Sequence, residues 1–146
     1  MSQINLIYVK RTQIEYSETR DISRDQIISL YKQNEWSSAE KPDKLHKALL
    51  NSHSLVSAWK NDQLVGVGNA ISDGYLVVYY PHLLVLPPFQ RQGIGKNTFK
   101  LLMKKYEGFH QHMLVADHDA TGFYKSCGFS RAGKTIPMWI YTGKDH

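Results

Sequence analysis

The pattern of apolar and polar residues changes twice within a short stretch in the middle of the chain. Four apolar residues, Leu83–Leu86, are too few for a buried helix and are stopped by Pro87-Pro88, which predicts a short buried strand. After a glycine-containing turn, apolar residues recur with the i, i+3, i+4, i+7 spacing of one helix face: Phe99, Leu102, Met103 and Tyr106. The stretch Leu83–Lys96 therefore predicts a strand, a glycine-rich turn and the N-terminus of a helix.

The N-terminal third predicts two short strands followed by two helices. The strands are expected over Ile4–Lys10 and Thr12–Tyr16. Ser23 and Gln26 form the S-x-x-Q pattern of a capping box and open the first helix, and Pro42 opens the second. The apolar stripes of these helices are Ile27, Leu30 and Tyr31 in the first, and Leu45, Ala48 and Leu49 in the second.

Three strands are expected to follow the helices. Ser54–Trp59 and Leu64–Ile71 are joined by a short polar turn, and Asp73-Gly74 is a strong hairpin signal that leads into a third strand, Tyr75–Leu86. Pro81 interrupts that third strand and removes one ladder donor, so it predicts an edge, a bulge or a splayed strand.

The C-terminal part predicts one more strand, a helix and two closing strands. The strand is expected over Gln111–Ala116, the helix over Asp117–Cys127, and Gly128 stands where a helix terminates. The closing strands are Phe129–Ala132 and Ile136–Tyr141. Long hairpins beside one parallel crossover indicate an α+β fold with a mixed, mostly antiparallel sheet, rather than a doubly wound sheet.

The glycine-rich turn suits an anionic ligand. The first turn of a helix has free N–H groups and a partial positive charge, glycines let the backbone approach a phosphate, and Arg91 and Lys96 add formal charge. The Walker A spacing and the G-x-G-x-x-G dinucleotide pattern are both absent, which leaves Gln90-x-x-Gly93-x-Gly95 after a strand. Taken alone, these six residues fit an ordinary strand-to-helix turn equally well.

Length and composition restrict the class of protein. The 146 residues predict a single domain over residues 1–146, and no apolar run approaches the ~20 residues of a membrane-spanning helix. The N-terminus lacks the plan of a signal peptide and Cys127 is the only cysteine, so we expect a cytoplasmic protein without membrane association.

Charge and histidine content predict neither a nucleic-acid partner nor a metal. The net charge of +5 fits a polyanionic cofactor, and no nucleic-acid-binding motif accompanies it. His110, His112 and His118 lack cysteine or carboxylate neighbours at ligand spacing, so alternation along a strand explains them better than a metal site.

Two motifs together resemble those of the GNAT superfamily of acetyl-CoA-dependent N-acetyltransferases. The glycine turn is similar to the family's [QR]-x-x-G-x-[GA], and Ala120-x-x-Phe123-Tyr124-x-x-x-Gly128-Phe129 is similar to its A-x-x-[FL]-Y-x-x-x-G-F. The resemblance implies a splayed sheet with acetyl-CoA between its two parts and no metal. It implies that the backbone of Leu84 and Val85 holds the pantetheine and that the pyrophosphate is held by Arg91, Gln92, Gly93, Ile94, Gly95 and Lys96.

The resemblance also assigns the chemistry to two side chains. Tyr124 corresponds to the family tyrosine that faces the CoA sulfur, where a phenol can either stabilise or protonate the leaving thiolate, whose thiol has a pKa of ~8.5. His82, on the strand before the loop, has the ordinary pKa of ~6.5 that suits a general base. A strand-edge histidine beside Pro81 is an equally good reading of His82.

The acceptor is expected to be a small molecule with a primary amine. Trp36, Asp73 and Tyr80 are the candidate substrate residues, and the aromatic side chains among them would suit a cationic or aryl amine. A core position explains Trp36 equally well, and the hairpin turn explains Asp73 better. A protein lysine or N-terminus remains an alternative acceptor, and a CoA-binding regulatory module without turnover is an alternative function. Exposed closing strands such as Ile136–Tyr141 also make a homodimer possible.

Overall fold

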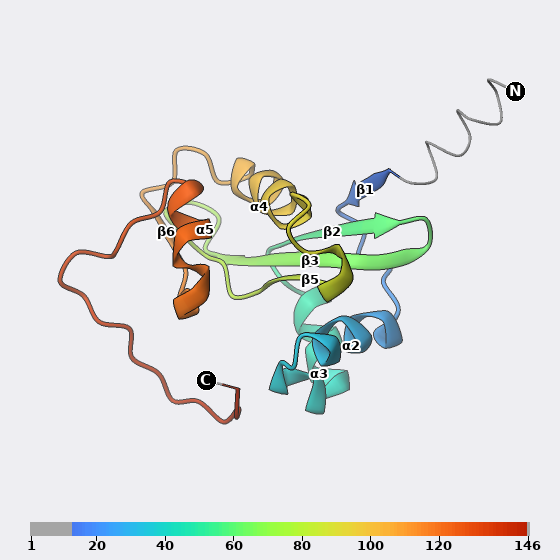
Figure 1. Ribbon diagram of the computed structural model, residues 1–146. Helices are drawn as coiled ribbons and strands as arrows, with labels where there is room; N and C mark the ends of the chain where they lie inside the picture. Colours follow the sequence, from blue (N-terminus) through green and yellow to red (C-terminus); the bar gives the residue numbers. More distant parts are fainter. Residues whose placement is uncertain (1–12, 146) are drawn as a thin grey trace, which may run out of the picture.

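A computed structural model describes residues 13–145 (Figure 1). The described part of the chain forms a six-stranded mixed sheet with four α-helices, so the predicted α+β fold is confirmed. The strands are β1 Ile14–Ser17, β2 Ser54–Lys60, β3 Gln63–Ser72, β4 Val77–Tyr79, β5 Leu83–Val85 and β6 Gln111–Met113. The helices are α2 Arg24–Gln33, α3 Pro42–Leu50, α4 Ile94–Lys104 and α5 Thr121–Ser126, with short 3₁₀ turns η1 Ser37–Glu40, η2 Pro87–Phe89 and η3 His118–Ala120.

The long strand β3 pairs with two different strands along one edge. The main order is β1-β2-β3-β4-β6, and β5 pairs with β3 beside β4. Ile71 lies opposite Tyr79 of β4, whereas Gly66 lies opposite Val85 of β5. The predicted strand Tyr75–Leu86 is therefore broken at Pro81, which has no N–H to donate. The only parallel pairing in residues 13–145 joins β4 to β6, and β5 does not pair with β6.

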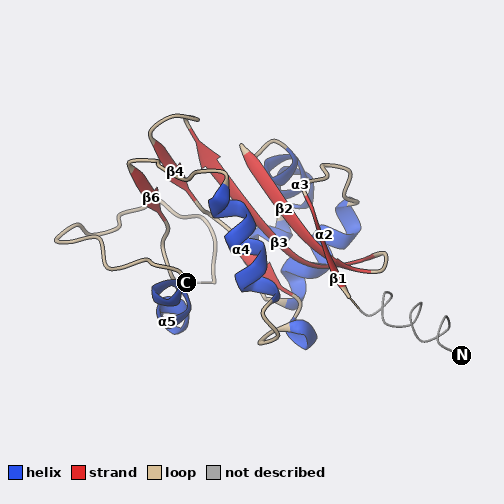
Figure 2. Cartoon of the chain, turned by 90° about the horizontal axis from the view of Figure 1, so that it is seen from above, coloured by secondary structure: helices blue, strands red, loops and turns tan. Residues whose placement is uncertain are grey.

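Helices cover both faces of the sheet. Helix α4 lies over one face, and α2 and α3 lie over the other (Figures 1 and 2). Alternation along β3 divides its side chains, because Val65 and Val67 pack with α2 and α3 while Gly68 faces α4. A Cβ atom on Gly68 would lie 3.1 Å from Leu83 Cδ1 and 3.4 Å from Thr98 Cγ2, so the absence of a side chain lets α4 approach the sheet closely.

The predicted helix starts are confirmed. Ser23 Oγ accepts a hydrogen bond from the N–H of Gln26 at 3.3 Å, and Pro42 occupies the first turn of α3. The side chain of Gln26 does not complete the capping box. It bonds instead to the backbone of Asp62 and Leu64 in the β2–β3 turn, which ties α2 to the sheet. The predicted stripe of α3 is correct except that Ala48 is exposed.

The C-terminal expectations are corrected for four segments. Phe129–Ala132 and Ile136–Tyr141 form no strands, because within residues 13–145 neither segment has a neighbouring strand to supply ladder hydrogen bonds. The strand predicted over Gln111–Ala116 is shortened to β6, and the helix predicted over Asp117–Cys127 divides into η3 and α5. The predicted strand Ile4–Lys10 lies outside the described residues. In residues 13–145, no helix combines the length and the apolar character needed to cross a bilayer.

Candidate active site

The N-terminus of α4 presents backbone N–H groups at the end of the glycine turn. Gly93 precedes the helix with a left-handed φ of +86°, and no side chain caps the first turn. Ile94 is buried and fixes the helix start against the sheet, while Arg91, Gln92 and Gly93 are exposed. Arg91 also has a left-handed backbone, with a φ of 64°. This exposed turn has the N–H groups, helix dipole and positive charge that bind phosphate.

Three elements of the candidate site meet at Gly95. A Cβ atom built on Gly95 would lie 3.5 Å from Cγ2 of Val85 and 4.0 Å from Cζ of Phe123. These contacts bring the edge of β5, the start of α4 and the side of α5 to one point, although their sequence positions span 38 residues. The two separate sequence motifs therefore lie side by side in the structure.

The backbone edge of β5 is set by its pairing with β3. The carbonyl of His82 accepts from the N–H of Asn69, and the N–H of Leu86 donates to the carbonyl of Val65, so by the alternation of an antiparallel ladder Leu84 also faces β3. The two residues predicted to hold pantetheine therefore differ. The backbone N–H and carbonyl of Leu84 point toward β3, whereas those of Val85 point to the open edge of β5.

The carbonyl of Val85 is already occupied by two side chains. Nδ2 of Asn34 donates to it at 3.1 Å, and Nε2 of Gln90 donates to it at 2.9 Å. A carbonyl oxygen has two lone pairs, and these two donors occupy both of them. The N–H of Val85 is therefore the backbone group of that residue best suited to an amide ligand. Gln90 also donates to Oδ1 of Asn34, so the first residue of the glycine motif joins the turn to β5 and α2.

Tyr124 is a half-buried phenol within an aromatic cluster. Its ring packs edge-on against Phe99 at 5.5 Å and against Phe123 at 5.1 Å. Burial raises the pKa of Tyr124 to about 12, with a smaller contribution in the same direction from the carboxylate of Asp117. The hydroxyl therefore keeps its proton at neutral pH and can act as a hydrogen-bond donor.

His82 lies between two aromatic rings in the segment that separates β4 from β5. Its Nδ1 is 2.7 Å from the hydroxyl of Tyr31, and its ring packs edge-on against Trp36 at 5.0 Å. Burial lowers the pKa of His82 to about 4, and the carboxylate of Asp145 opposes this shift. The ring is therefore neutral at pH 7, but it binds a proton much more weakly than an exposed histidine.

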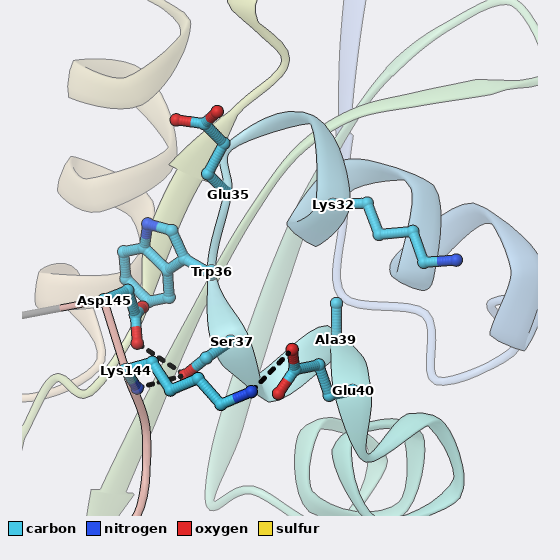
Figure 3. Close-up of a pocket in the computed structure, with 8 residues that line it drawn as sticks. All are labelled: Lys32, Glu35, Trp36, Ser37, Ala39, Glu40, Lys144 and Asp145. Carbon is cyan, nitrogen blue, oxygen red and sulfur yellow. Dashed lines mark hydrogen bonds and ion pairs between the residues drawn. The ribbon is translucent and has the colours of Figure 1, made fainter.

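A cavity of about 600 Å³ lies beside Trp36, between the α2–η1 loop and the end of the described chain (Figure 3). Ser37 Oγ donates to Asp145 at 2.5 Å, and Lys144 forms an ion pair with Glu40 at 3.5 Å. Burial pushes the pKa of Asp145 upward, but hydrogen bonds from Ser37 and Tyr141 outweigh it and hold this pKa well below its usual range. The complete lining is Lys32, Glu35, Trp36, Ser37, Ala39, Glu40, Lys144 and Asp145.

The other two candidate substrate residues do not line this cavity. Oδ1 of Asp73 accepts hydrogen bonds from the N–H groups of Leu76, Tyr75 and Val77, which lower the pKa of Asp73 and shape the turn before β4. Tyr80 is buried, and its hydroxyl lies 2.8 Å from Nδ1 of His112. Of the three, the structure brings only Trp36 to the cavity. Among the described residues, no three His, Cys, Asp or Glu side chains form a group that could hold a metal ion.

Comparison with known proteins identifies the family. The sequence profile described as "Acetyltransferase (GNAT) domain" matches residues 18–137. The chain belongs to the GNAT acetyltransferase family. This membership confirms the family predicted from the two motifs.

Individual relatives agree with this GNAT assignment. A GCN5-related N-acetyltransferase 3 of Arabidopsis thaliana, named as chloroplastic, is 37% identical over 83 residues, which are 54% of this chain and 35% of that protein. A solved GNAT-family acetyltransferase from Streptococcus pneumoniae is 28% identical, with a TM-score of 0.74 over 88% of this chain and 97% of its own. An aminoglycoside N-acetyltransferase solved with CoA shares the fold, with a TM-score of 0.68 and 13% identity over 90% of this chain and 97% of its own.

Sequence reasoning missed the residues that position the GNAT site. Asn34 stands at the end of α2, where an asparagine is an ordinary helix terminator, and nothing in the sequence connects it to Val85, 51 residues later. Tyr31 belongs to the apolar stripe of α2, as its spacing predicts, but its hydroxyl also reaches His82. Asp145 carried no sequence signal because its partner Ser37 is 108 residues away.

Proposed function

We propose that the chain transfers the acetyl group of acetyl-CoA to a primary amine by direct attack in a ternary complex. The proposal is supported mainly by the contacts that Gly95 makes with Val85 and Phe123. Because of these contacts, the edge of β5, the glycine turn and the helix that contains Tyr124 lie beside one another. The N–H of Val85 would bind a pantetheine carbonyl as an added strand does. The backbone of Gly93–Lys96 and the side chain of Arg91 would hold the pyrophosphate.

In the reaction, the amine nitrogen attacks the thioester carbonyl, a C–N bond forms, and the C–S bond breaks to release the thiolate of CoA. Tyr124, with a pKa of about 12, faces a leaving group whose thiol has an ordinary pKa of ~8.5. Full proton transfer from the phenol would be unfavourable by about 3.5 pKa units, or roughly 5 kcal/mol. Tyr124 therefore stabilises the thiolate by donating a hydrogen bond, and it does not give up its proton.

The amine must lose a proton as the C–N bond forms. A resting ammonium group with a pKa of ~10.4 is too weak an acid for His82, whose pKa is about 4. The amine therefore attacks as its minor neutral form, which has a lone pair to form the C–N bond. Its nitrogen becomes positively charged and far more acidic once it is bonded to the carbonyl carbon, and His82 accepts the proton at that stage. This role requires Nδ1–H to donate to the hydroxyl oxygen of Tyr31, which leaves Nε2 unprotonated.

The acceptor amine binds in the cavity beside Trp36. The loop that carries Trp36 is joined to the cofactor edge by the hydrogen bond from Asn34 to Val85, and the Trp36 ring touches His82. Three carboxylates (Glu35, Glu40 and Asp145) and two ammonium groups (Lys32 and Lys144) line the same cavity, so its net charge is −1. Together with the face of the Trp36 ring, this charge favours a positively charged small molecule. A cytoplasmic location and a small-molecule acceptor stay predictions, since the Arabidopsis relative is named for the chloroplast and this chain matches about a third of its length.

A calorimetric titration with acetyl-CoA, followed by an amine panel assayed for free thiol, tests this function. The panel starts with aminoglycosides and polyamines and includes peptides with a free lysine or N-terminus. Binding with thiol release on one small-amine class supports the proposal, and release only on peptides would move the acceptor to proteins. Binding without release on any amine would favour a regulatory module, and failure to bind acetyl-CoA would overturn the site assignment.

A further inference from the structure

The carboxylate of Glu35 lines the cavity beside Trp36, and it differs from the other two carboxylates there. Glu40 forms an ion pair with Lys144, and Asp145 accepts hydrogen bonds from two hydroxyl groups. In the described part of the chain, no ion pair and no side-chain hydrogen bond is found for Glu35. Its negative charge is therefore available to a ligand in the cavity.

The end of α2 does not require a side chain at position 35. The helix closes with a Schellman motif, in which the N–H of Glu35 donates to the carbonyl of Lys32 at 2.9 Å and the N–H of Trp36 donates to the carbonyl of Tyr31 at 3.0 Å. Glu35 is the left-handed residue of this motif, with a φ of 60°. Glycine fills that position without steric cost, so the whole side chain can be removed without disturbing the helix end.

Two different environments adjoin Trp36. Its ring contacts His82, which also packs against the fully buried ring of Tyr31, and burial there lowers the pKa of His82 to about 4. These surroundings disfavour a positive charge, so they suit the neutral amine that attacks the thioester. The residue before Trp36 is the exposed Glu35, whose carboxylate favours a positive charge. In Figure 3 the Glu35 carboxylate and the Trp36 ring lie on one side of the loop, and the Lys32 ammonium points away from both.

We propose that the acceptor is a diamine, of which one nitrogen reacts near His82 while the other, as an ammonium group, pairs with the carboxylate of Glu35. This inference rests on the proposed function, because it names the class of amine that the same cavity takes. A carboxylate beside the reacting nitrogen would hold it in the protonated form, which has no lone pair, so Glu35 assists only through a second nitrogen. The methylene chain between the two nitrogens packs against the ring of Trp36. The first nitrogen forms the C–N bond as the thiolate of CoA leaves, and the second keeps its proton throughout.

Calorimetric titration of the full chain with bound CoA tests the proposal without turnover, since CoA carries no acetyl group. Putrescine, cadaverine and hexamethylenediamine are each compared with the monoamine of the same carbon number: butylamine, pentylamine and hexylamine. We expect at least one diamine to bind about fivefold or more tightly than its monoamine, because it adds one charge pair with Glu35. Glu35→Gln should abolish this preference and leave the Kd of the monoamine unchanged. Glu107→Gln is the matched control, because it removes an exposed carboxylate beyond the end of α4 and should keep the preference.

Glu35→Gly separates an effect on binding from an effect on folding. It should unfold at the same urea concentration as the parent protein or at a higher one, because glycine relieves the left-handed backbone. It should nevertheless lose the preference for diamines, as Glu35→Gln does. Equal affinity of the parent protein for diamines and monoamines would overturn the proposal, and so would a preference that survives both substitutions.

The binding measurement and the thiol assay separate this inference from the proposed function. Selective binding of diamines, with no thiol released from acetyl-CoA on any amine, would support the diamine site and contradict acetyl transfer. Acetylation of diamines and monoamines with the same KM would support acetyl transfer and overturn the diamine site.

Discussion

Nδ2 of Asn34 lies 3.1 Å from the carbonyl oxygen of Val85 and donates a hydrogen bond to it. The same amide nitrogen donates to the carbonyl of Leu30 one turn back in α2, and Oδ1 of Asn34 accepts from Gln90. One side chain therefore joins the end of α2, the open edge of β5 and the start of the glycine turn. This arrangement sets the position of the loop that carries Trp36 relative to the edge of β5.

Asn34→Ala should both destabilise the protein and weaken acetyl-CoA binding. Asn51→Ala is the matched control, because Asn51 also ends a helix and donates to the carbonyl four residues back, but no strand contact is recorded for its side chain. We expect Asn34→Ala to lower the free energy of unfolding by about 1–2 kcal/mol more than Asn51→Ala does. It should also raise the KM for acetyl-CoA, which the control leaves unchanged. Urea denaturation and initial rates measure the two effects, and equal behaviour of the two variants would contradict the positioning role.

Gly93→Asp should weaken acetyl-CoA binding while leaving the fold intact. Gly93 has a φ of +86°, and a Cβ atom there meets no described atom within 4 Å. Asparagine and aspartate tolerate this left-handed backbone about equally, so Gly93→Asn reproduces the strain without the charge. We expect the Kd for acetyl-CoA to be about tenfold or more higher for Gly93→Asp than for Gly93→Asn, because a carboxylate repels a pyrophosphate at that position. Similar affinities in a calorimetric titration would show that the turn does not hold the phosphates.

The elements that sequence predicted well are those determined by local signals. Three of these signals act within a few residues, and the structure confirms each of them. They are the i, i+3 spacing of Phe99 and Leu102, the N-terminal proline of α3 and the Asp73-Gly74 turn. Pro81 also acts locally, since a missing N–H breaks the third strand wherever its neighbours lie.

The elements that sequence predicted poorly depend on distant partners. Ile136–Tyr141 has strand-forming residues but no adjacent strand in the described part of the chain, so its β propensity produces no strand. The sequence offers Tyr80 as a candidate substrate residue, but Tyr80 packs against Phe99 and Tyr106 in the core. In the candidate site, the motifs predicted the glycine turn and Tyr124, whereas Asn34 and Asp145 act through contacts with residues 51 and 108 positions away.

Tyr124→Phe should reduce kcat by about 100-fold, as the loss of one preorganised donor to a developing charge does. The KM for acetyl-CoA should change little, because the ring packing against Phe99 is kept. Tyr75→Phe is the control, since Tyr75 is an exposed tyrosine away from the aromatic cluster. The defect should shrink with an acetyl thioester whose thiol has a lower pKa, because that leaving group needs less stabilisation. An unchanged kcat would remove Tyr124 from the chemistry.

His82 should make stability depend on pH between about 4 and 6.5. Burial lowers the pKa of His82 to about 4 in the folded protein, while the unfolded chain has the ordinary value of ~6.5. Below pH 6.5 the unfolded state gains a proton that the folded state does not, so stability present above that pH is lost as the pH falls toward 4. The loss from this residue is about 2 kcal/mol between pH 7 and pH 5.

Urea denaturation at pH 7 and pH 5 measures this dependence. His82→Gln should reduce the difference between the two pH values, whereas His110→Gln, at an exposed histidine, should leave it as in the parent protein. The absolute stability of His82→Gln will be lower because its packing against Trp36 is lost, but the comparison between pH values cancels that effect. The same pH dependence in His82→Gln as in the parent would mean that the buried ring titrates like an exposed one.

The pKa of His82 also determines the pH at which kcat/KM should fall if His82 is the base. If His82 accepts the proton, the acidic limb of kcat/KM should lie near pH 4 and not near pH 6.5, because only the protonated ring is inactive. The profile needs an acceptor whose amine is neutral above pH 5, so that the substrate's own titration does not hide the limb. His82→Gln should lower kcat/KM across the range and abolish this limb, while His110→Gln keeps it. A limb that persists at the same pH in His82→Gln would assign the proton to another group or to water.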